Sequence, residues 1–460
     1  MVFGSALVHD REKLRERFSL DEHSAVLIVG LGKTGYSVAR FLAARSIHFA
    51  VTDGQEHPAF LEDFRASFPD AAVFLDGFHA TAFDAASHLV VSPGVPLSHP
   101  LITNARARGV PVIGDLDLFA AVVEVPVLAV TGSNGKSTVT TLLGLMAEAD
   151  GRNTRAGGNL GTPMLDLIEP GIECYVLELS SFQLESSHFL EPIVATVLNV
   201  SPDHMDRYAD LEAYSKAKQR IFHGQGVMVL NKDDPVVASM AMSGRRLLWF
   251  GLDSKDVDYE IRERDGVEWL FGCGEWIMPR DSVQLAGRHN VANVLAALAM
   301  GDAAGFSRHA MVEAVSHFRG LAHRTEWVAD IEGITFINDS KATNVGACLA
   351  ALNGMDRPVI LIAGGDGKGA DFGILREAVV RKVKALILMG RDASLMKEAL
   401  GDLVETVMVA NLKGAVVAAR EKASAGDVVM LAPACASLDQ FKDYQERGRV
   451  FREEVGKLVS

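Results

Sequence analysis

The stretch Ala129-Val130-Thr131-Gly132-Ser133-Asn134-Gly135-Lys136-Ser137-Thr138 decides the fold of this chain. Apolar residues before the turn predict a buried strand, and the residues after it predict a helix as far as Met146. A glycine-rich turn between a strand and a helix gathers backbone N–H groups at the positive end of the helix dipole, where phosphate binds. Lys136 would reach the terminal phosphates, and Ser137 or Thr138 would bind Mg²⁺. The stretch therefore predicts an α/β protein that uses ATP.

The loop differs from the common phosphate-loop pattern. Only Ser133 and Asn134 separate Gly132 from Gly135, where the common pattern has four residues between its glycines. A strand-to-helix junction that needs glycine for packing alone is the structural alternative. The sequence Gly-Lys-Ser-Thr directly after a buried strand favours phosphate over that alternative.

Composition limits the classes of function. The chain has 460 residues and a net charge of −14, from 45 basic and 59 acidic residues, which argues against nucleic-acid binding. Its 4 cysteines are scattered without a Cys-x-x-Cys pair, as in a reducing compartment. We find no apolar signal core at the N-terminus and no apolar run near the ~20 residues of a membrane span. We expect a cytoplasmic monomer that enters no membrane.

Strands and helices alternate in three blocks. We place domain boundaries at 1–114, 115–320 and 321–460. Alternation of this kind predicts parallel sheets covered by helices. Several strands end in glycine-rich or small polar turns, which is where open α/β sheets bind ligands.

A second glycine-rich turn lies in the first block. Gly30-Leu31-Gly32-Lys33-Thr34-Gly35 follows an apolar strand, and Asp53 lies roughly twenty residues further on, as in NAD-binding proteins. The turn offers its N–H groups to any diphosphate, however, and a nucleotide-sugar diphosphate satisfies it equally. With a separate ATP loop downstream, we favour a diphosphate ligand other than NAD.

Polar residues also follow strands in the second block. Glu178 ends the strand 175–179, where other phosphate-loop enzymes place a Mg²⁺ ligand. His204 lies in Asp203-His204-Met205-Asp206-Arg207 after the strand 194–200, and neutral histidine is a good metal ligand. Lys218 lies in the helical run 214–222, where nothing physical distinguishes it from Lys216.

Three loops of the third block share this placement. The segments 338–344 and 364–369 each carry a lysine among small residues, which suits carboxylate or phosphate capture, and 433–441 follows another strand. The structural alternative for Ser437 is the cap of a helix that begins there, and a cap position also leaves free N–H groups for an anion. Solvated loops are the structural alternative.

These motifs together resemble the Mur ligase family of bacterial cell-wall synthesis, from about Val26 to about Val455. Each motif alone is weak, but their order and spacing are specific. The matching segments, in chain order, are GLGKTG, SPG, TGSNGKST, GGNLG, ELSSFQLE, LNVSPDHMDRY, AKQRI, GRHNVANVLAA, HRTE, NDSKATN, GGDGKGADF and PACASLDQF.

The resemblance implies three domains: a Rossmann-like domain for a UDP-linked substrate, a central ATPase domain and a Rossmann-like domain for an amino acid. It also implies an ATP-dependent amide ligase of peptidoglycan synthesis. ELSSFQLE, DHMDRY and PACASLDQF favour the branch that adds D-glutamate to UDP-N-acetylmuramoyl-L-alanine. Members of this branch form an acyl phosphate and then a tetrahedral intermediate. Two Mg²⁺ ions are expected, and closure of the domains would use hinges near Gly114 and Gly320.

The resemblance implies a role for each residue of the site. It implies catalytic roles for Lys136, His204, Lys218 and Lys341, and carbamylation of Lys218. The implied metal ligands are Ser137, Glu178, His204 and Lys218. The implied ATP contacts are Gly132, Asn134, Gly135, Lys136, Ser137, Thr138, Asn159, Asn290, Asn293, Arg324 and Asp339. The implied UDP-substrate contacts are Thr34, Asp53, Gly94 and Asn159, and the implied D-glutamate contacts are Thr343, Lys368, Ser437 and Leu438.

The chain departs from the family pattern at two places. Lys33 occupies a turn position that is often apolar, and Gly54 and Gln55 follow Asp53 where a hydroxyl and a basic residue are common. The charged N-terminal extension also lies outside the pattern. A sibling ligase for another amino acid, a folate polyglutamylating ligase, an NAD-dependent oxidoreductase and a non-catalytic nucleotide-binding regulator remain the alternatives.

Overall fold

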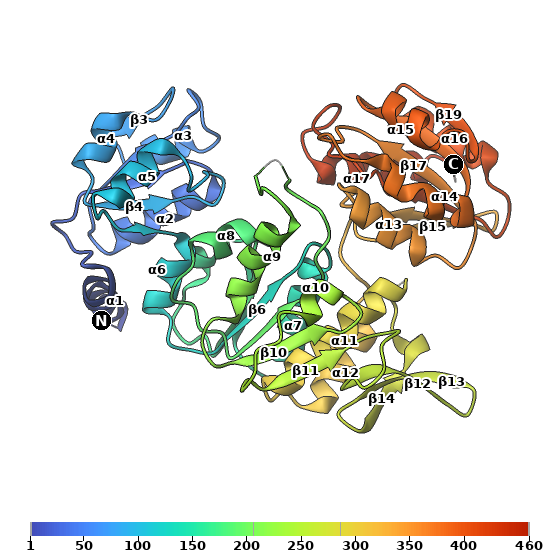
Figure 1. Ribbon diagram of the computed structural model, residues 1–460, viewed down its shortest axis with the longest axis horizontal. Helices are drawn as coiled ribbons and strands as arrows, with labels where there is room; N and C mark the ends of the chain where they lie inside the picture. Colours follow the sequence, from blue (N-terminus) through green and yellow to red (C-terminus); the bar gives the residue numbers. More distant parts are fainter. Residues whose placement is uncertain (1, 206, 286, 459–460) are drawn as a thin grey trace.

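The computed structural model describes residues 2–205, 207–285 and 287–458. Asp206 of the histidine motif, and the outermost ends of the first and third predicted domains, lie outside this part. The chain forms three α/β domains, each built on one sheet, and the N-terminal and C-terminal domains lie on either side of the central one (Figure 1). Within the described residues, no helix is both long and apolar enough to cross a membrane.

The N-terminal sheet has five parallel strands in the order β3-β2-β1-β4-β5. The strand order reverses between β1 and β4, which leaves a crevice beyond their carboxyl ends. The glycine-rich turn and the Ser-Pro-Gly segment both open at this crevice. The strands are β1 (Val26–Val29), β2 (Phe49–Thr52), β3 (Val73–Phe74), β4 (His88–Val91) and β5 (Val112–Ile113), and the helices are α2 (Lys33–Ala44), α3 (Leu61–Ser67), α4 (Ala80–Ala85) and α5 (Pro100–Ala107).

The charged N-terminal extension forms helix α1 (Val2–Phe18), which packs on α6 (Asp115–Val122) at the start of the central domain. Leu14 and Phe18 are buried. The Lys13 ammonium donates to the carbonyl of Val122 at 3.2 Å, and the His88 ring hydrogen-bonds the carbonyl of Phe18 at 2.9 Å. The helix thus contacts both the N-terminal and the central domain.

The central sheet has nine strands in the order β14-β13-β12-β11-β10-β9-β6-β8-β7, parallel except for the hairpins at β13 and β14. The phosphate-loop strand β6 lies between β8 and β9, so the loop is surrounded by parallel strand ends. The strands are β6 (Val127–Thr131), β7 (Thr154–Gly158), β8 (Cys174–Glu178), β9 (Val194–Val197), β10 (Val227–Asn231), β11 (Leu247–Phe250), β12 (Tyr259–Arg264), β13 (Val267–Gly272) and β14 (Glu275–Pro279).

The helices of the central domain cover both faces of this sheet (Figure 1). They are α7 (Lys136–Ala149), α8 (Ser181–Ser186), α9 (Leu211–Gln219), α10 (Pro235–Ala238), α11 (Arg288–Ala303) and α12 (Arg308–His317), with 3₁₀ turns η1 (Met164–Leu167), η2 (Arg220–Phe222) and η3 (Arg280–Ser282). The sequence predicts one helix through Phe222, but the last turn is 3₁₀. Strand β9 is shorter than expected, because the chain after Val197 turns toward the phosphate loop.

The C-terminal sheet has six strands in the order β15-β16-β20-β17-β18-β19. Strands β16, β20 and β17 are parallel neighbours, so the three loops after them meet at one edge. The elements are β15 (Glu326–Ile331), β16 (Ile334–Asn338), α13 (Val345–Asn353), β17 (Val359–Gly364), η4 (Phe372–Leu375), α14 (Arg376–Lys382), β18 (Val383–Met389), α15 (Ala393–Leu400), β19 (Glu405–Met408), α16 (Leu412–Lys422), β20 (Val428–Leu431) and α17 (Tyr444–Gly456).

The interpretation of Ser437 as a helix cap is wrong. Ser437 does not cap a helix: its carbonyl accepts the N–H groups of Gln440 and Phe441 in a turn. The next helix, α17, begins at Tyr444 and is capped by the Asp443 side chain.

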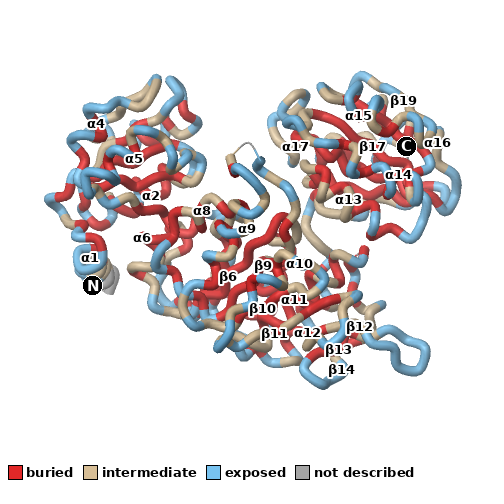
Figure 2. The backbone as a smooth tube through the Cα atoms, in the orientation of Figure 1, coloured by how far each residue is buried: buried red, intermediate tan, exposed pale blue. Residues whose placement is uncertain are grey.

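Buried residues follow the strands of all three sheets (Figure 2). The apolar core of the N-terminal sheet is continuous with the core on one face of the central sheet, through Leu14 of α1 and Phe119 of α6. The two apolar clusters of the C-terminal sheet lie within residues 328–458. The first two domains are therefore joined by a shared core, whereas the third has cores of its own.

Candidate active site

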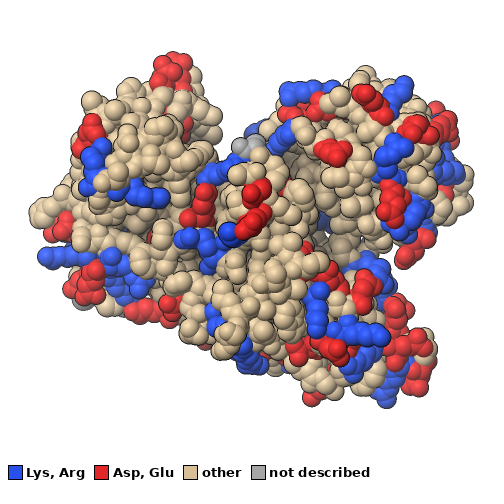
Figure 3. Space-filling model, viewed as in Figure 1, with Lys and Arg blue, Asp and Glu red and all other residues tan. Residues whose placement is uncertain are grey.

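A cleft of about 1260 Å³ is lined by residues of all three domains. The N-terminal and C-terminal domains rise as two lobes with a hollow between them (Figure 3). Fifteen of the predicted site residues line this cleft: Thr34, Asp53, Gly94, Asn134, Gly135, Lys136, Ser137, Asn159, Glu178, His204, Lys218, Arg324, Lys341, Thr343 and Lys368.

The phosphate loop joins β6 to α7 as predicted. Gly135 caps α7 with φ +84°, and a Cβ there would lie 2.3 Å from the Oδ1 atom of Asn293. Glycine is therefore required twice, by its backbone angle and by the close approach of that side chain. Lys136 bends back over the loop and donates to the carbonyls of Gly132 at 2.8 Å and Ser133 at 2.9 Å. Burial lowers the pKa of Lys136, and the Glu178 carboxylate opposes this shift.

Two hard oxygen ligands meet beside the loop. Strands β6 and β8 pair in register at Val130 and Glu178, and the Ser137 hydroxyl donates to the Glu178 carboxylate at 2.5 Å. Asn159 donates to the other oxygen of this carboxylate at 2.7 Å, and Arg324 donates to the Ser137 hydroxyl at 2.6 Å. Mg²⁺ is commonly held by one or two such protein oxygens, with phosphate and water completing its shell.

No group of three His, Cys, Asp or Glu side chains suited to a metal occurs in the described parts of the chain. The donor set of Ser137 and Glu178 nevertheless fits one Mg²⁺ ion, because a nucleotide supplies the remaining oxygens. When bound, the ion would neutralise phosphate charge.

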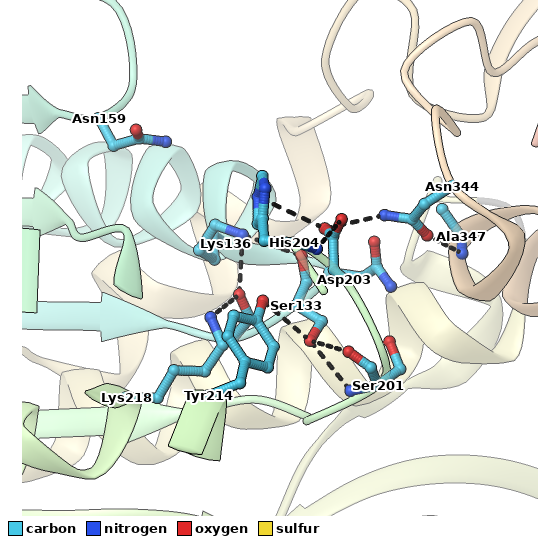
Figure 4. Close-up of polar contacts among 12 residues, drawn as sticks. Ser133, Lys136, Asn159, Ser201, Asp203, His204, Tyr214, Lys218, Asn344 and Ala347 are labelled. Carbon is cyan, nitrogen blue, oxygen red and sulfur yellow. Dashed lines mark hydrogen bonds and ion pairs between the residues drawn. The ribbon is translucent and has the colours of Figure 1, made fainter. Parts of the chain in front are cut away.

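Lys218 lies deep beneath the loop. Its side chain is 1% exposed, its amino group donates to the carbonyl of Gly132 at 2.9 Å, and it lies 4.4 Å from the Tyr214 ring centre (Figure 4). Burial, and then the nearby Lys136, lower the pKa of Lys218 well below its usual value. Lys216 instead forms an exposed ion pair with Glu212 at 2.6 Å. The structure therefore distinguishes two lysines that the sequence could not.

Asp203 connects the central and C-terminal domains, and His204 lies beside it. The His204 ring lies 3.8 Å from the Asp203 carboxylate and 4.7 Å from the Phe182 ring centre. The Asn344 side chain of the C-terminal domain donates to Asp203 at 3.1 Å (Figure 4). Asp203 belongs to the histidine motif, so the sequence carried a signal for it, whereas Asn344 has no signal that links it to this loop.

Lys341 and Asp339 lie after β16, at the C-terminal edge of the cleft. Burial, and then the charge of Arg324, lower the pKa of Lys341 to about 8. Its ammonium lies 4.0 Å from the Tyr444 ring centre. Burial raises the pKa of Asp339 to about 6, although its carboxylate accepts the N–H of Thr325 at 3.2 Å.

A second cavity of about 320 Å³ lies behind the phosphate loop, between α11 and α13. Asn293 lines it together with His289, and burial lowers the pKa of His289 to about 4. Asn293 donates to Asn290 at 3.2 Å, so Asn290 supports the lining. The predicted residues that line neither cavity are Gly132, Thr138, Asn290, Asp339, Ser437 and Leu438.

Arg447 holds two of the C-terminal loops and was missed by the sequence analysis. It is 1% exposed, and its guanidinium donates to the carbonyl of Ser340 at 2.8 Å and to that of Cys435 at 3.1 Å. The first carbonyl follows β16 and the second follows β20. An arginine in a charged helix carries no sequence signal for such a role.

Three family models match the chain. They describe the Mur ligase MurD-like N-terminal domain over residues 24–114, the Mur ligase middle domain over residues 130–301 and the Mur ligase glutamate ligase domain over residues 323–435. The N-terminal match includes the glycine-rich turn at residues 30–35.

Curated relatives match along nearly the whole chain. A protein of Methylococcus capsulatus is 56% identical over 96% of this chain and 97% of its own length, and one of Nitrosococcus oceani is 50% identical over 94% and 97%. One of Pseudomonas putida is 49% identical over 94% and 97%. All three are named UDP-N-acetylmuramoylalanine–D-glutamate ligase.

Solved structures share the fold. A pseudomurein peptide ligase type C of Methanothermus fervidus has a TM-score of 0.61 at 17% identity, covering 95% of this chain and 100% of its own. The UDP-N-acetylmuramate–alanine ligase of Thermotoga maritima has a TM-score of 0.60 at 19% identity, with the same coverage. The three family models and the full-length relatives show that this chain belongs to the Mur ligase family.

Proposed function

We propose that this chain is an ATP-dependent ligase that adds D-glutamate to UDP-N-acetylmuramoyl-L-alanine in peptidoglycan synthesis. The observation that carries the proposal is one cleft in which the phosphate loop, the pair Ser137 and Glu178 and the lysine loops of the C-terminal domain face each other. The names of the full-length relatives support the same substrates.

The reaction joins a carboxylate to an amine. The alanine carboxylate of the UDP-linked substrate attacks the γ-phosphorus of ATP and releases ADP, which leaves an acyl phosphate. The amine of D-glutamate attacks this carbonyl, loses a proton, and the tetrahedral intermediate expels phosphate to form the amide. The protein contributes by positioning the reactants and by offsetting negative charge, for which Lys136, Arg324 and Lys341 are available.

We propose Ser137 and Glu178 as ligands of one Mg²⁺ ion, and His204 with carbamylated Lys218 at a second. Carbamylation requires a neutral amine, because the Nζ lone pair attacks carbon dioxide and a proton leaves to solvent. The burial of Lys218 and its lowered pKa supply that neutral amine. The product is an anion, which would lie beside the ammonium of Lys136.

We assign the remaining roles by domain, with boundaries at 1–114, 115–320 and 321–460. The UDP-linked substrate would bind at Thr34 and Gly94, with Asp53 holding the glycine-rich turn in place, and the adenine would occupy the cavity at Asn293. D-glutamate would bind at Lys368 and Thr343, and Ser437 and Leu438 would join them only after the domains close. We also propose that the enzyme works as a monomer in the cytoplasm, because one chain supplies the whole cleft and ATP is consumed.

The experiment that tests the proposal measures phosphate release from ATP and Mg²⁺, with UDP-N-acetylmuramoyl-L-alanine and D-glutamate omitted in turn. L-glutamate, D-aspartate and L-lysine serve as alternative acceptors. Release that requires both substrates, with D-glutamate preferred, is expected. Preference for another amino acid would indicate a sibling ligase, and absence of release with every acceptor would reject the proposal.

The oxidoreductase alternative has little support at its own site. The two oxygens of Asp53 already accept backbone N–H groups, from Leu31 at 2.6 Å and Gln55 at 2.9 Å. A dinucleotide site would use this carboxylate for ribose hydroxyls. In this protein the carboxylate holds the glycine-rich turn instead.

A further inference from the structure

Lys33 is a cation in the glycine-rich turn that the proposed chemistry does not use. It is the first residue of α2, its side chain is exposed, and it lines the N-terminal end of the cleft. A Cβ added at Gly32 beside it, or at Gly94 in the loop after β4, would meet nothing within 4 Å. The turn therefore faces open space on the side where Lys33 lies.

The N-terminal end of the cleft has few charged side chains. Among the lining residues from 30 to 95, Lys33 is the one basic residue and Asp53 the one acidic residue. The Asp53 carboxylate is occupied by the backbone N–H groups of Leu31 and Gln55. A ligand with negative charge that enters here would therefore meet backbone N–H groups and a single side-chain cation.

The hydrogen-bond acceptor of Lys33 in the structure is a neutral carbonyl, which binds an ammonium less strongly than a phosphate oxygen does. Its ammonium donates to the carbonyl of Gly161, in the central-domain loop that also carries Asn159. Lys33 forms no ion pair with any residue that the structure describes. A hydrogen bond to an anionic phosphate oxygen is roughly twice as strong as one to a neutral carbonyl, so a diphosphate competes well for this ammonium.

We propose that Lys33 binds the diphosphate of the UDP-linked substrate, and that it leaves the Gly161 carbonyl to do so. The proposal rests on the function proposed above and adds a residue to it. Because Gln55 is neutral and Gly54 has no side chain, Lys33 supplies the side-chain charge for the diphosphate.

Arg40 provides a matched control. It lies on the same helix, and it also bridges to the central domain, through an ion pair with Asp166 at 2.5 Å. Arg40 does not line the cleft. The variants Lys33→Met and Arg40→Met therefore each remove one bridge between the domains, but only the first removes a cleft cation.

The test compares the wild type, Lys33→Met, Lys33→Arg and Arg40→Met in calorimetric titrations with UDP and with uridine, and in phosphate-release kinetics. Lys33→Met is expected to weaken UDP binding and to raise KM for the UDP-linked substrate about tenfold, as for loss of one charged hydrogen bond. Uridine binding and kcat are expected to stay within about twofold, because neither depends on the diphosphate contact. Lys33→Arg retains most of the affinity, and Arg40→Met retains all of it.

Several outcomes would overturn the proposal. Unchanged UDP affinity in Lys33→Met, an equal loss for uridine and UDP, or an equal loss in Arg40→Met would each reject a diphosphate contact. A wild type that releases phosphate while KM is unchanged in Lys33→Met rejects the Lys33 proposal alone. A wild type that neither binds UDP nor releases phosphate rejects the function as well. Unchanged melting temperatures verify that the variants are folded, since Lys33 and Arg40 are exposed.

Discussion

Lys136 and Lys218 both direct their amino groups to the carbonyl oxygen of Gly132, at 2.8 and 2.9 Å. Two ammonium groups this close repel each other, which disfavours their charged forms, and burial disfavours the charged forms further. The charge of Lys136 therefore adds to burial in lowering the pKa of Lys218. The pair is stabilised when one member loses its charge, and it is stabilised further when that member becomes an anion.

The variant Lys218→Ala is accordingly expected to lose about a hundredfold in activity, the upper end of the loss seen when a residue that supports a metal ligand is changed. Because the missing group is a carboxylate-like anion, added formate, acetate or propionate should restore part of the activity. The measurement is phosphate release with and without each acid. Lys216→Ala, which alters an exposed lysine of the same helix, should remain fully active. Full activity of Lys218→Ala would contradict the carbamate role.

The pH dependence of ATP use is predicted to reflect Lys341, whose pKa is lowered to about 8. Because this pKa is lower than that of an exposed lysine, the Lys341 ammonium loses its proton and its positive charge at a lower pH. The apparent kcat/KM for ATP, which reports groups of the free enzyme, should therefore fall as pH rises through about 8. Lys341→Arg keeps its charge and should give a profile without this fall, at a lower absolute rate. A flat wild-type profile between pH 7 and 9 would disprove the assignment.

At the scale of elements, helix α1 is expected to contribute to stability as well as to connectivity. Leu14 is fully buried against α6, whereas Val8 on the same helix is 47% exposed. Leu14→Ala should lower the free energy of unfolding by about 2–5 kcal/mol, as for other buried leucines. Val8→Ala should change it by no more than about 0.5 kcal/mol. Guanidinium unfolding of the two variants measures the difference, and equal effects would show that α1 does not contribute through packing.

The elements that the sequence predicts well are those with a strong local pattern. The apolar strands and the helix after the phosphate loop follow from periodicity and from the Gly-Lys-Ser-Thr segment. The packing of α1 was missed, because its apolar residues are few and its charged residues suggest solvent on all sides. The turn at Ser437 was missed because a serine at a possible cap looks the same in sequence whether a helix follows or not.

The candidate site was predictable only in part, for a related reason. Lys136, Glu178 and His204 lie at the ends of strands that are neighbours in the sheet. The sequence motifs and the predicted strand ends were therefore enough to place these residues in one site. Asn344 reaches Asp203 across the boundary between two domains. Tyr444 and Arg447 reach their partners only because β16 and β20 are neighbours in space. No local pattern encodes that order.

At the scale of the whole molecule, the cores indicate which domain moves. The N-terminal and central domains share an apolar cluster, whereas the C-terminal clusters contain residues of that domain alone. We expect the C-terminal domain to close over the cleft when ATP and the UDP-linked substrate bind, through a hinge near Gly320, with less motion near Gly114. Solution scattering should show a smaller radius of gyration with both ligands than without. Identical profiles would contradict closure.

The position of α1 also has a consequence for synthesis of the chain. Lys13 hydrogen-bonds a carbonyl 109 residues later, and Leu14 belongs to a cluster that includes Leu116 and Phe119. Ribosomes add about 5–20 residues per second, so the apolar side of α1 waits about 5–20 s for its partner to be made. Helix α1 must therefore remain uncovered while the entire N-terminal sheet is synthesised. Nascent chains of this protein are expected to expose the apolar side of α1, where a chaperone that binds apolar segments can attach, until α6 emerges and covers it.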